Sequence, residues 1–134
     1  MRIDERVRQN IVIIEPTGRL TVETEEQFTA AVRRLLHAGW TRLVLNLASV
    51  PYMDSCGLGA LAQAYVSAWR HGGELKLLNV GGRNLSLLTI TKLATVFEVF
   101  DSEDDAERSF GAGPRPRDAR VTVAIRHSAQ SAST

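Results

Sequence analysis

Short apolar runs alternate along this chain with longer segments in which apolar residues recur every three or four positions. The runs 11–14 (IVII), 43–47 (LVLNL) and 75–80 (LKLLNV) indicate strands. The segments 21–39 and 55–71 between them have the apolar stripe of amphipathic helices. Repeated strand–helix–strand units of this kind predict a mostly parallel sheet covered by helices.

The complete pattern predicts the element order ββαβαβαβα in one domain. Weaker strands are expected at 3–7, before a turn at 8–10, and at 97–100. Two further helices are expected at about 83–93 and from 102 to about 110, where Ser102 and Asp105 form a capping box. The expected fold class is therefore α/β, with a mixed, mostly parallel sheet of four to five strands packed by about four helices.

The helix at 55–71 is expected to bury one continuous stripe of its surface. Its larger apolar residues are spaced by alternating steps of three and one, which is typical of a helix with one buried face. They are Leu58, Leu61, Ala62, Tyr65, Val66 and Trp69. Gly72 and Gly73 predict where the helix ends.

Composition excludes several classes of protein. The 134 residues fit one domain, and a formal net charge of +1 does not favour nucleic-acid binding through a basic surface. The single cysteine, Cys56, excludes an internal disulfide and a multi-thiolate metal site. No apolar run approaches the roughly 18 residues of a membrane span. Because the N-terminal residues lack an apolar signal segment, a cytoplasmic location without membrane insertion is expected.

Residues 111–134 differ in composition from residues 1–110. They hold four arginines against one aspartate, are rich in Gly, Pro, Ala and Ser, and contain no Leu, Phe, Trp or Tyr. Such a segment buries little apolar surface to offset the entropy lost on ordering. We expect a folded domain at 1–110 and a disordered basic extension at 111–134. Within the extension, 121–125 (VTVAI) alternates like a short strand that could dock on a sheet edge or a neighbouring molecule.

The segment 51–59 (PYMDSCGLG) contains the best candidates for functional residues. It follows a buried run, and ligand sites of α/β sheets form at the carboxyl ends of strands. Asp54 or Ser55 is a candidate N-cap, where backbone N–H groups lack helical partners and the helix dipole is positive. Gly57 and Gly59 lie in the first turn, where alanine would favour the helix by about 1 kcal/mol each. Their presence predicts close approach by another backbone or by a partner molecule.

Two enzymatic interpretations of this segment fail. The G-x-G-x-x-A pattern at 57–62 lacks the tight strand-to-helix turn of a dinucleotide site, and Glu74 is the only acid between residues 55 and 97. Ser55 lies in no G-x-S-x-G elbow, and no histidine is expected near Ser55 or Cys56 to act as a base. The histidines are His37, His71 and His127. The sequence therefore predicts that the protein is not an enzyme and that it has neither catalytic residues nor a metal site.

The residues 52–59 (YMDSCGLG) resemble the signature of the STAS domain, in particular that of bacterial anti-sigma factor antagonists. That signature reads aromatic, Met or Ile, Asp, Ser, then Ser, Thr or Cys, then Gly-Leu-Gly. Weaker matches are 16–20 (PTGRL), 43–47 and 72–75 (GGEL), and 80–100 resembles the closing helix and strand of the family. The resemblance covers about residues 7–110.

The resemblance implies a regulatory switch. In this family an ATP-dependent anti-sigma factor Ser/Thr kinase phosphorylates the serine after the signature aspartate, which is Ser55 here. The unphosphorylated protein binds the kinase, which then releases its sigma factor, and a metal-dependent Ser/Thr phosphatase removes the phosphate. The protein itself would need no cofactor and would be a monomer or weak dimer. The expected contact residues are Thr21, Tyr52, Met53, Asp54, Ser55, Cys56, Gly57, Leu58, Gly59, Ala60, Gln63 and Ser67.

One departure from the family pattern concerns residue 21. The family often carries an acid after the second strand, in a Gly-x-Leu/Val-Asp pattern, whereas Gly18-Arg19-Leu20 is followed here by Thr21. An acid there is associated with the phosphorylation site, so its absence bears on kinase efficiency. It also leaves open an alternative, a non-switching STAS subunit of a lipid or anion transport assembly or a ligand-sensing module.

Overall fold

A five-stranded sheet forms the centre of the computed structural model, which describes residues 1–110. Its strands are β1 (Arg2–Arg8), β2 (Ile11–Thr17), β3 (Arg42–Asn46), β4 (Glu74–Leu78) and β5 (Val99–Phe100). They lie side by side in chain order. β1 and β2 form an antiparallel hairpin, whereas β2 to β5 pair in parallel.

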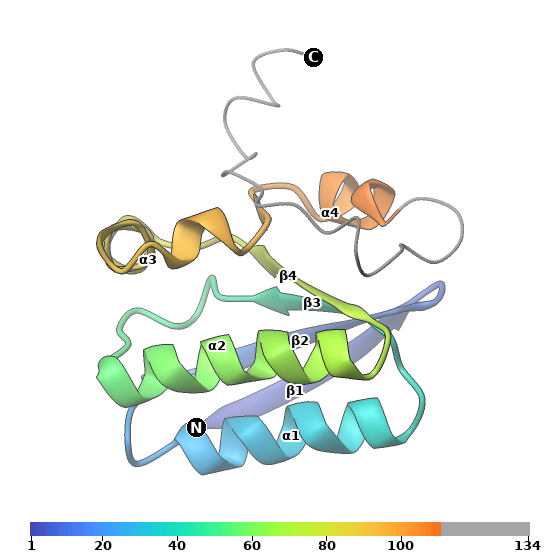
Figure 1. Ribbon diagram of the computed structural model, residues 1–134, viewed down its shortest axis with the longest axis horizontal. Coiled ribbons are helices and arrows are strands. Elements are labelled where there is room, and N and C mark those ends of the chain that lie inside the picture. The colour runs from blue at the N-terminus through green and yellow to red at the C-terminus, as the bar shows by residue number, and fades with distance from the viewer. Residues whose placement is uncertain (111–134) are drawn as a thin grey trace.

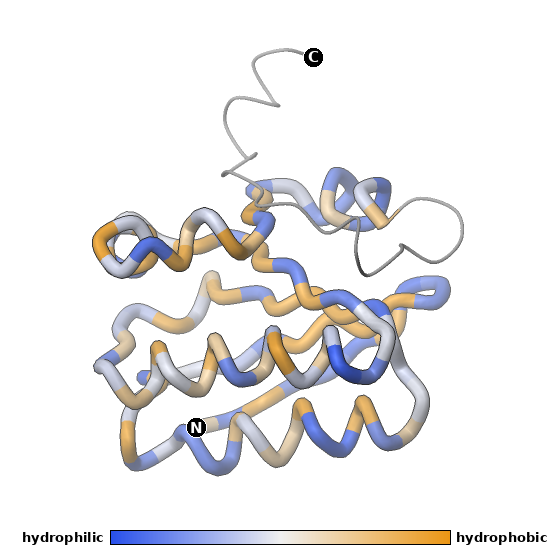
Figure 2. The backbone as a smooth tube through the Cα atoms, viewed as in Figure 1, coloured by the Kyte–Doolittle hydropathy of each residue, from blue (hydrophilic) through white to orange (hydrophobic). Residues whose placement is uncertain are grey.

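Helices cover both faces of the sheet. They are α1 (Glu25–His37), α2 (Ser55–Arg70), α3 (Gly82–Ile90) and α4 (Glu103–Ser109), with a 3₁₀ turn, η1 (Leu93–Thr95). α1 and α2 lie next to each other on one face, and α4 lies on the other (Figure 1). Figure 2 shows apolar residues concentrated in the strands between these layers, while the β1–β2 turn is hydrophilic.

The core has two parts because side chains alternate along each strand. Val12, Leu43 and Leu77 point to the face of α1 and α2 and join a large buried cluster with Phe28. A smaller cluster lies on the face of α4: Ile11, Ile13, Val44, Leu78, Phe100, Ala106 and Phe110. The central strands are therefore buried on both sides, which explains why the sequence shows continuous apolar runs there.

The predicted order of elements is confirmed, and the differences concern their ends. β4 ends at Leu78, because Asn79 adopts a left-handed φ of 59° that turns the chain toward α3. α3 ends at Ile90, and Lys92, with a φ of 68°, separates it from η1. The predictions for 111–134, including a strand at 121–125, lie outside the described residues.

The predicted buried stripe of α2 is wrong in its details. The buried residues of this helix are Gly57, Ala60, Leu61, Ala64 and Ala68. Val66, which was expected to be buried, is 38% exposed. The small residues recur every four positions, so they share one face and let the helix pack closely against its neighbours. The sequence pattern favoured the larger apolar side chains as the buried ones. In the structure, close packing of the helix buries the alanines instead.

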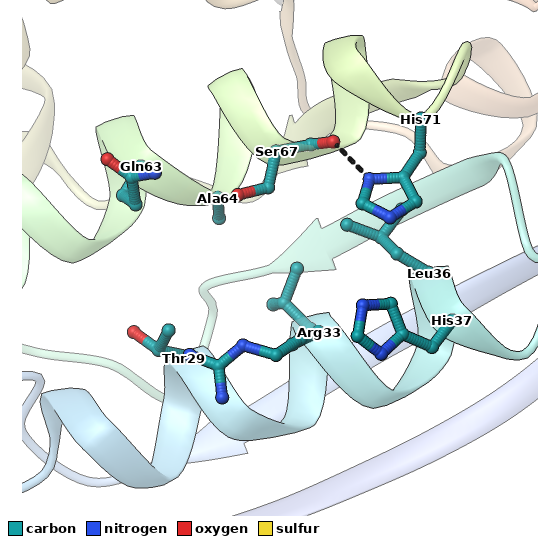
Figure 3. Close-up of a pocket in the computed structure, with 9 residues that line it drawn as sticks. Thr29, Arg33, Leu36, His37, Gln63, Ala64, Ser67 and His71 are labelled. Atoms are coloured by element: carbon teal, nitrogen blue, oxygen red, sulfur yellow. Dashed lines mark hydrogen bonds between the residues drawn. The ribbon is translucent and has the colours of Figure 1, made fainter.

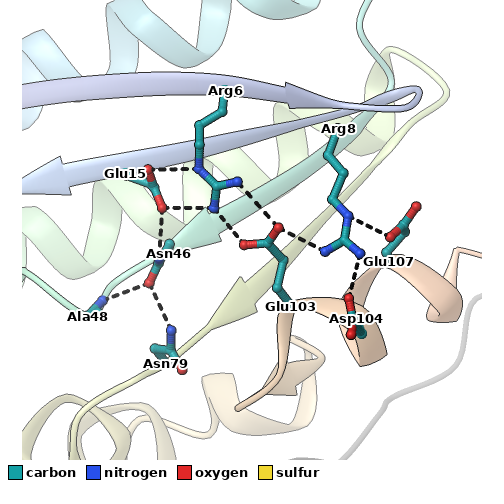
Figure 4. Close-up of polar contacts among 9 residues, drawn as sticks. All are labelled: Arg6, Arg8, Glu15, Asn46, Ala48, Asn79, Glu103, Asp104 and Glu107. Atoms are coloured by element: carbon teal, nitrogen blue, oxygen red, sulfur yellow. Dashed lines mark hydrogen bonds and ion pairs between the residues drawn. The ribbon is translucent and has the colours of Figure 1, made fainter.

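Arginines of β1 hold α4 against the hairpin (Figure 4). Arg6 contacts Glu15 at 3.1 Å and Glu103 at 2.5 Å, although Arg6 and Glu103 are 97 residues apart. Arg8 contacts Glu103 at 2.9 Å and Asp104 at 2.5 Å. The hydrogen bonds from Arg6 hold the pKa of Glu103 and of Glu15 below their ordinary values.

We expect Arg6→Gln to lower the free energy of unfolding by about 1 kcal/mol at neutral pH, since the network is only partly buried. The carboxylates have lowered pKa values in the folded protein, so their contribution is present above the ordinary pKa and is lost as pH falls through the folded value. Urea unfolding at neutral pH and at about pH 3 measures the difference. Arg2→Gln, which removes only the exposed pair with Asp4, is the matched control. A deficit for Arg6→Gln that is equal at both pH values would contradict this role.

Candidate functional site

Two loops at the carboxyl ends of parallel strands meet at the start of α2. Leu20, between β2 and α1, and Met53, between β3 and α2, form a parallel β-bridge. The Leu20 N–H donates to the Tyr52 carbonyl at 3.0 Å, and the Asp54 N–H donates to the Leu20 carbonyl at 3.3 Å. The side chains of Leu20 and Met53 are both buried. The core beneath the bridge therefore fixes the backbone that leads into α2.

Asp54 is the N-cap of α2 and also ties the two loops together. Its Oδ1 accepts a hydrogen bond from the Gly57 N–H at 2.8 Å, and its Oδ2 accepts one from the Val22 N–H at 3.2 Å. The hydrogen bond from Gly57, followed by that from Val22, favours the ionised carboxylate and lowers the pKa of Asp54. Of the two candidate caps, Asp54 is confirmed.

Ser55 is the first residue of α2 and is exposed. Backbone N–H groups of a first helical turn point away from the helix body and carry positive partial charge. A phosphate on the Ser55 hydroxyl would lie at this positive end of a 16-residue helix. The neighbouring Asp54 carboxylate is already engaged by backbone N–H groups. The position is therefore both accessible to a modifying enzyme and compatible with a bound phosphate.

Tyr52 lies beside two arginines from other parts of the chain. The guanidinium carbon of Arg83, at the start of α3, lies 4.6 Å from the ring centroid, and that of Arg19 lies 5.8 Å from it. Both distances fall within the range of cation–π contacts. Neither arginine forms an ion pair with a carboxylate within residues 1–110. Together they give the loop before Ser55 a positively charged edge.

The predicted contact residues divide into three groups by exposure. Ser55, Gly59 and Gln63 are exposed and, at four-residue spacing, share one face of α2. The partly buried residues are Thr21, Tyr52, Asp54, Cys56, Leu58 and Ser67. The buried residues are Met53, Gly57 and Ala60.

The three buried residues correct the predicted contact surface. Met53 packs into the core beneath the bridge, and Ala60 belongs to the buried stripe of α2. A Cβ atom on Gly57 would lie 1.9 Å from the carbonyl oxygen of Leu20, whereas within the described part of the chain nothing lies within 4 Å of one on Gly59. Gly57 is thus required by the neighbouring loop, and Gly59 leaves open space above the helix.

Val22 is a surface feature that the sequence did not indicate. It is 62% exposed, although its N–H is held by Asp54. The adjacent Thr21 accepts a hydrogen bond through its hydroxyl from the Glu23 N–H at 3.3 Å. A single valine among polar loop residues shows no periodicity, so only the structure places this apolar side chain beside the start of α2.

The histidines lie away from the start of α2 within residues 1–110. His37 and His71 lie at the ends of α1 and α2, away from Ser55, as predicted. No three His, Cys, Asp or Glu side chains gather in this part of the chain to hold a metal ion. None of the helices described is long and apolar enough to cross a membrane.

The sequence of this chain is similar to a known protein family. The family model of the STAS domain matches residues 2–106. The anti-sigma-B factor antagonist of Bacillus subtilis is 27% identical over 99 residues, which cover 74% of this chain and 90% of that protein.

Two solved structures show the same fold. The Bacillus anti-sigma factor antagonist SpoIIAA in its unphosphorylated form has a TM-score of 0.65 and 21% identity, over 82% of this chain and 99% of that chain. SpoIIAA has also been solved in a phosphorylated form. The mouse anion transporter Slc26a9 has a TM-score of 0.65 and 18% identity, over 81% of this chain but only 19% of that chain.

The two glycines of α2 are expected to respond oppositely to substitution by alanine. Gly57→Ala forces a Cβ atom into the Leu20 carbonyl and should destabilise the protein by about 1–3 kcal/mol or more. Gly59→Ala meets open space and should stabilise the protein by up to about 1 kcal/mol. Thermal and urea unfolding of both variants measure these effects, and equal stabilities of the two would contradict the packing described.

Proposed function

The chain belongs to the STAS-domain family, and on this premise we propose that it is an anti-sigma factor antagonist switched by phosphorylation of Ser55. Unphosphorylated, it binds an anti-sigma factor Ser/Thr kinase, which then releases its sigma factor. The observation that carries the proposal is the exposed Ser55 at the first position of α2, directly after the capping Asp54. The similarity to the anti-sigma-B factor antagonist of Bacillus subtilis supports the class of partner.

Phosphorylation of Ser55 acts through charge. A phosphate adds about −1.5 to −2 charge, and the positive end of α2 stabilises it in the free protein. In an interface that fits a neutral hydroxyl, the same group loses hydration without gaining partners, which costs several kcal/mol. Because about 1.4 kcal/mol is tenfold in affinity, phosphorylation weakens kinase binding by at least about 100-fold without a change of shape.

The docking surface consists of the exposed face of α2, formed by Ser55, Gly59 and Gln63, flanked by Val22 and Tyr52. Gly59 has open space above it, so a partner can approach the helix backbone closely. Val22, which is 62% exposed and donates its N–H to Asp54, supplies an apolar contact next to the N-cap of α2. A charge placed at Ser55 therefore lies inside the contact area rather than at its rim.

The proposed switch also implies a role, a location and an oligomeric state for the protein. The protein acts as a regulator rather than as an enzyme and uses no cofactor, since the partner kinase binds the ATP. A metal-dependent Ser/Thr phosphatase restores the free hydroxyl. The protein works in the cytoplasm as a monomer or weak dimer, without membrane insertion or nucleic-acid binding.

The transport alternative is not favoured. The fold is shared with part of an anion transporter, but that match covers 19% of the transporter chain and shows the fold alone. The Bacillus subtilis antagonist, in contrast, is matched over 90% of its own length.

Incubation with the cognate kinase and ATP should place one phosphate on Ser55, located by mass spectrometry. Ser55→Ala should accept no phosphate and bind the kinase constitutively, whereas Ser55→Asp should bind at least tenfold more weakly because it carries a charge in the contact area. Calorimetry or surface plasmon resonance measures the affinities.

Ser49→Ala is the matched control for these variants, because Ser49 is also exposed and precedes the same helix. It should be phosphorylated and bind like the wild type. Equal kinase affinities of Ser55→Ala and Ser55→Asp, or phosphate on another residue with an active kinase, would contradict the proposed switch.

Arg19 and Arg83 indicate the chemistry of the partner surface. The family often carries an acid where this chain has Thr21, and here two arginines without ion pairs in residues 1–110 lie at Tyr52 instead. Complementary charges across an interface raise association rates and select partners. The kinase of this chain should therefore present acidic side chains beside the position of Ser55.

The double variant Arg19→Glu/Arg83→Glu should weaken kinase binding by about tenfold, mainly through slower association, and should reduce its dependence on salt. Arg108→Glu is the control, because Arg108 is exposed on α4, on the opposite face of the sheet. Stopped-flow association at several salt concentrations measures the effect. Equal association rates for the double variant and the control would exclude an acidic partner surface at this point.

A further inference from the structure

Two histidines lie together where α1 and α2 end, far from Ser55. His37 is the last residue of α1, and His71 is the C-cap of α2. Their ring centroids are 5.6 Å apart. Both line a groove of about 240 Å³ between the two helices (Figure 3). The proposed switch uses neither residue.

The hydrogen bonding of His71 prepares its ring to bind a metal ion. Nδ1 lies 2.9 Å from the carbonyl oxygen of Ser67. A carbonyl oxygen can only accept, so Nδ1 carries the hydrogen, and in the neutral ring Nε2 keeps its lone pair. Metal-binding histidines typically donate their second ring nitrogen to such a carbonyl, which fixes the tautomer and the ring orientation.

The orientation of the two rings suits one shared ion. Figure 3 shows the second ring nitrogen of His71 turned toward His37, and a ring nitrogen of His37 turned toward His71. Two imidazoles that bind one zinc ion at 2.0–2.1 Å have centroids roughly 5 Å apart. The observed separation is 5.6 Å, and both residues are exposed, so small side-chain rotations are enough to close the site.

The local electrostatics also favour a cation at this point. Both histidines lie at helix C-termini, where the helix dipole is negative. Arg33 is the one permanently charged side chain among the residues that line the groove, and its repulsion limits the affinity. No third His, Cys, Asp or Glu joins the pair within residues 1–110. Water or a group of a partner molecule completes the coordination.

We propose that His37 and His71 bind a divalent transition-metal ion that bridges the ends of α1 and α2. Imidazole nitrogen suits Zn²⁺, Ni²⁺ and Cu²⁺, whereas Mg²⁺ and Ca²⁺ prefer oxygen ligands. With two protein ligands the site is exchangeable, and the ion is not needed for folding. Because the bound ion favours the native state, zinc should raise the thermal unfolding temperature.

The test is a calorimetric titration of the full chain with Zn²⁺. We expect one ion per chain for the wild type, and at least tenfold weaker binding for His37→Gln and for His71→Gln, since each keeps only one ligand. His127→Gln and Cys56→Ser are the matched controls, because they remove the remaining histidine and the single cysteine. Both controls should bind zinc like the wild type and show the same thermal shift.

Two results would overturn the site. One is the absence of saturable zinc binding by the wild type. The other is undiminished binding by the folded His37→Gln/His71→Gln double variant, with circular dichroism as the check on folding. Imidazole nitrogen NMR gives an independent readout, in which zinc should shift Nε2 of His71 and leave its Nδ1 hydrogen in place. Coordination through Nδ1 would contradict the hydrogen bond to Ser67.

Discussion

The carbonyl group of Leu20 is the contact on which the geometry of the site depends. It accepts a hydrogen bond from the Asp54 N–H at 3.3 Å, and a Cβ atom at Gly57 would lie 1.9 Å from its oxygen. The loop before α1 therefore rests directly on the first turn of α2. Since Leu20 and Met53 are anchored in the core, Ser55 is presented by a backbone that the fold itself holds in place. In the proposed switch, Ser55 can then change its charge without a change in its position.

Polar contacts extend this constraint across the carboxyl ends of three neighbouring strands. Asn46, the last residue of β3, donates through Nδ2 to Glu15 at 3.0 Å. Its Oδ1 accepts from the Ala48 N–H at 3.1 Å and from the side chain of Asn79 at 3.2 Å (Figure 4). Glu15 is in turn shared with Arg6. The loop that leads to Ser55 is thus tied to β2, to β4 and, through Arg6, to α4.

Local patterns in the sequence predicted the elements, their order and Asp54 as a candidate helix cap, because strand and helix periodicity and helix capping depend on neighbouring residues. What they could not predict depends on distances between segments. Gly57 and Gly59 both lie at the start of α2, and only the adjacent loop shows that the first is packed and the second open. Arg83 reaches Tyr52 because two loops converge at one edge of the sheet. Exposure of Val22 likewise follows from the path of its loop.

Ser55 and His71 mark opposite ends of α2, and their separation decides how the proposed metal ion and the proposed phosphate can affect each other. A helix of 16 residues is roughly 24 Å long. This exceeds the Debye length of about 8 Å at physiological ionic strength, so the charge of one group is largely screened at the other. The buried stripe of small residues between them packs α2 closely against its neighbours. A metal ion at His71 should therefore stabilise the fold with little direct electrostatic effect on Ser55.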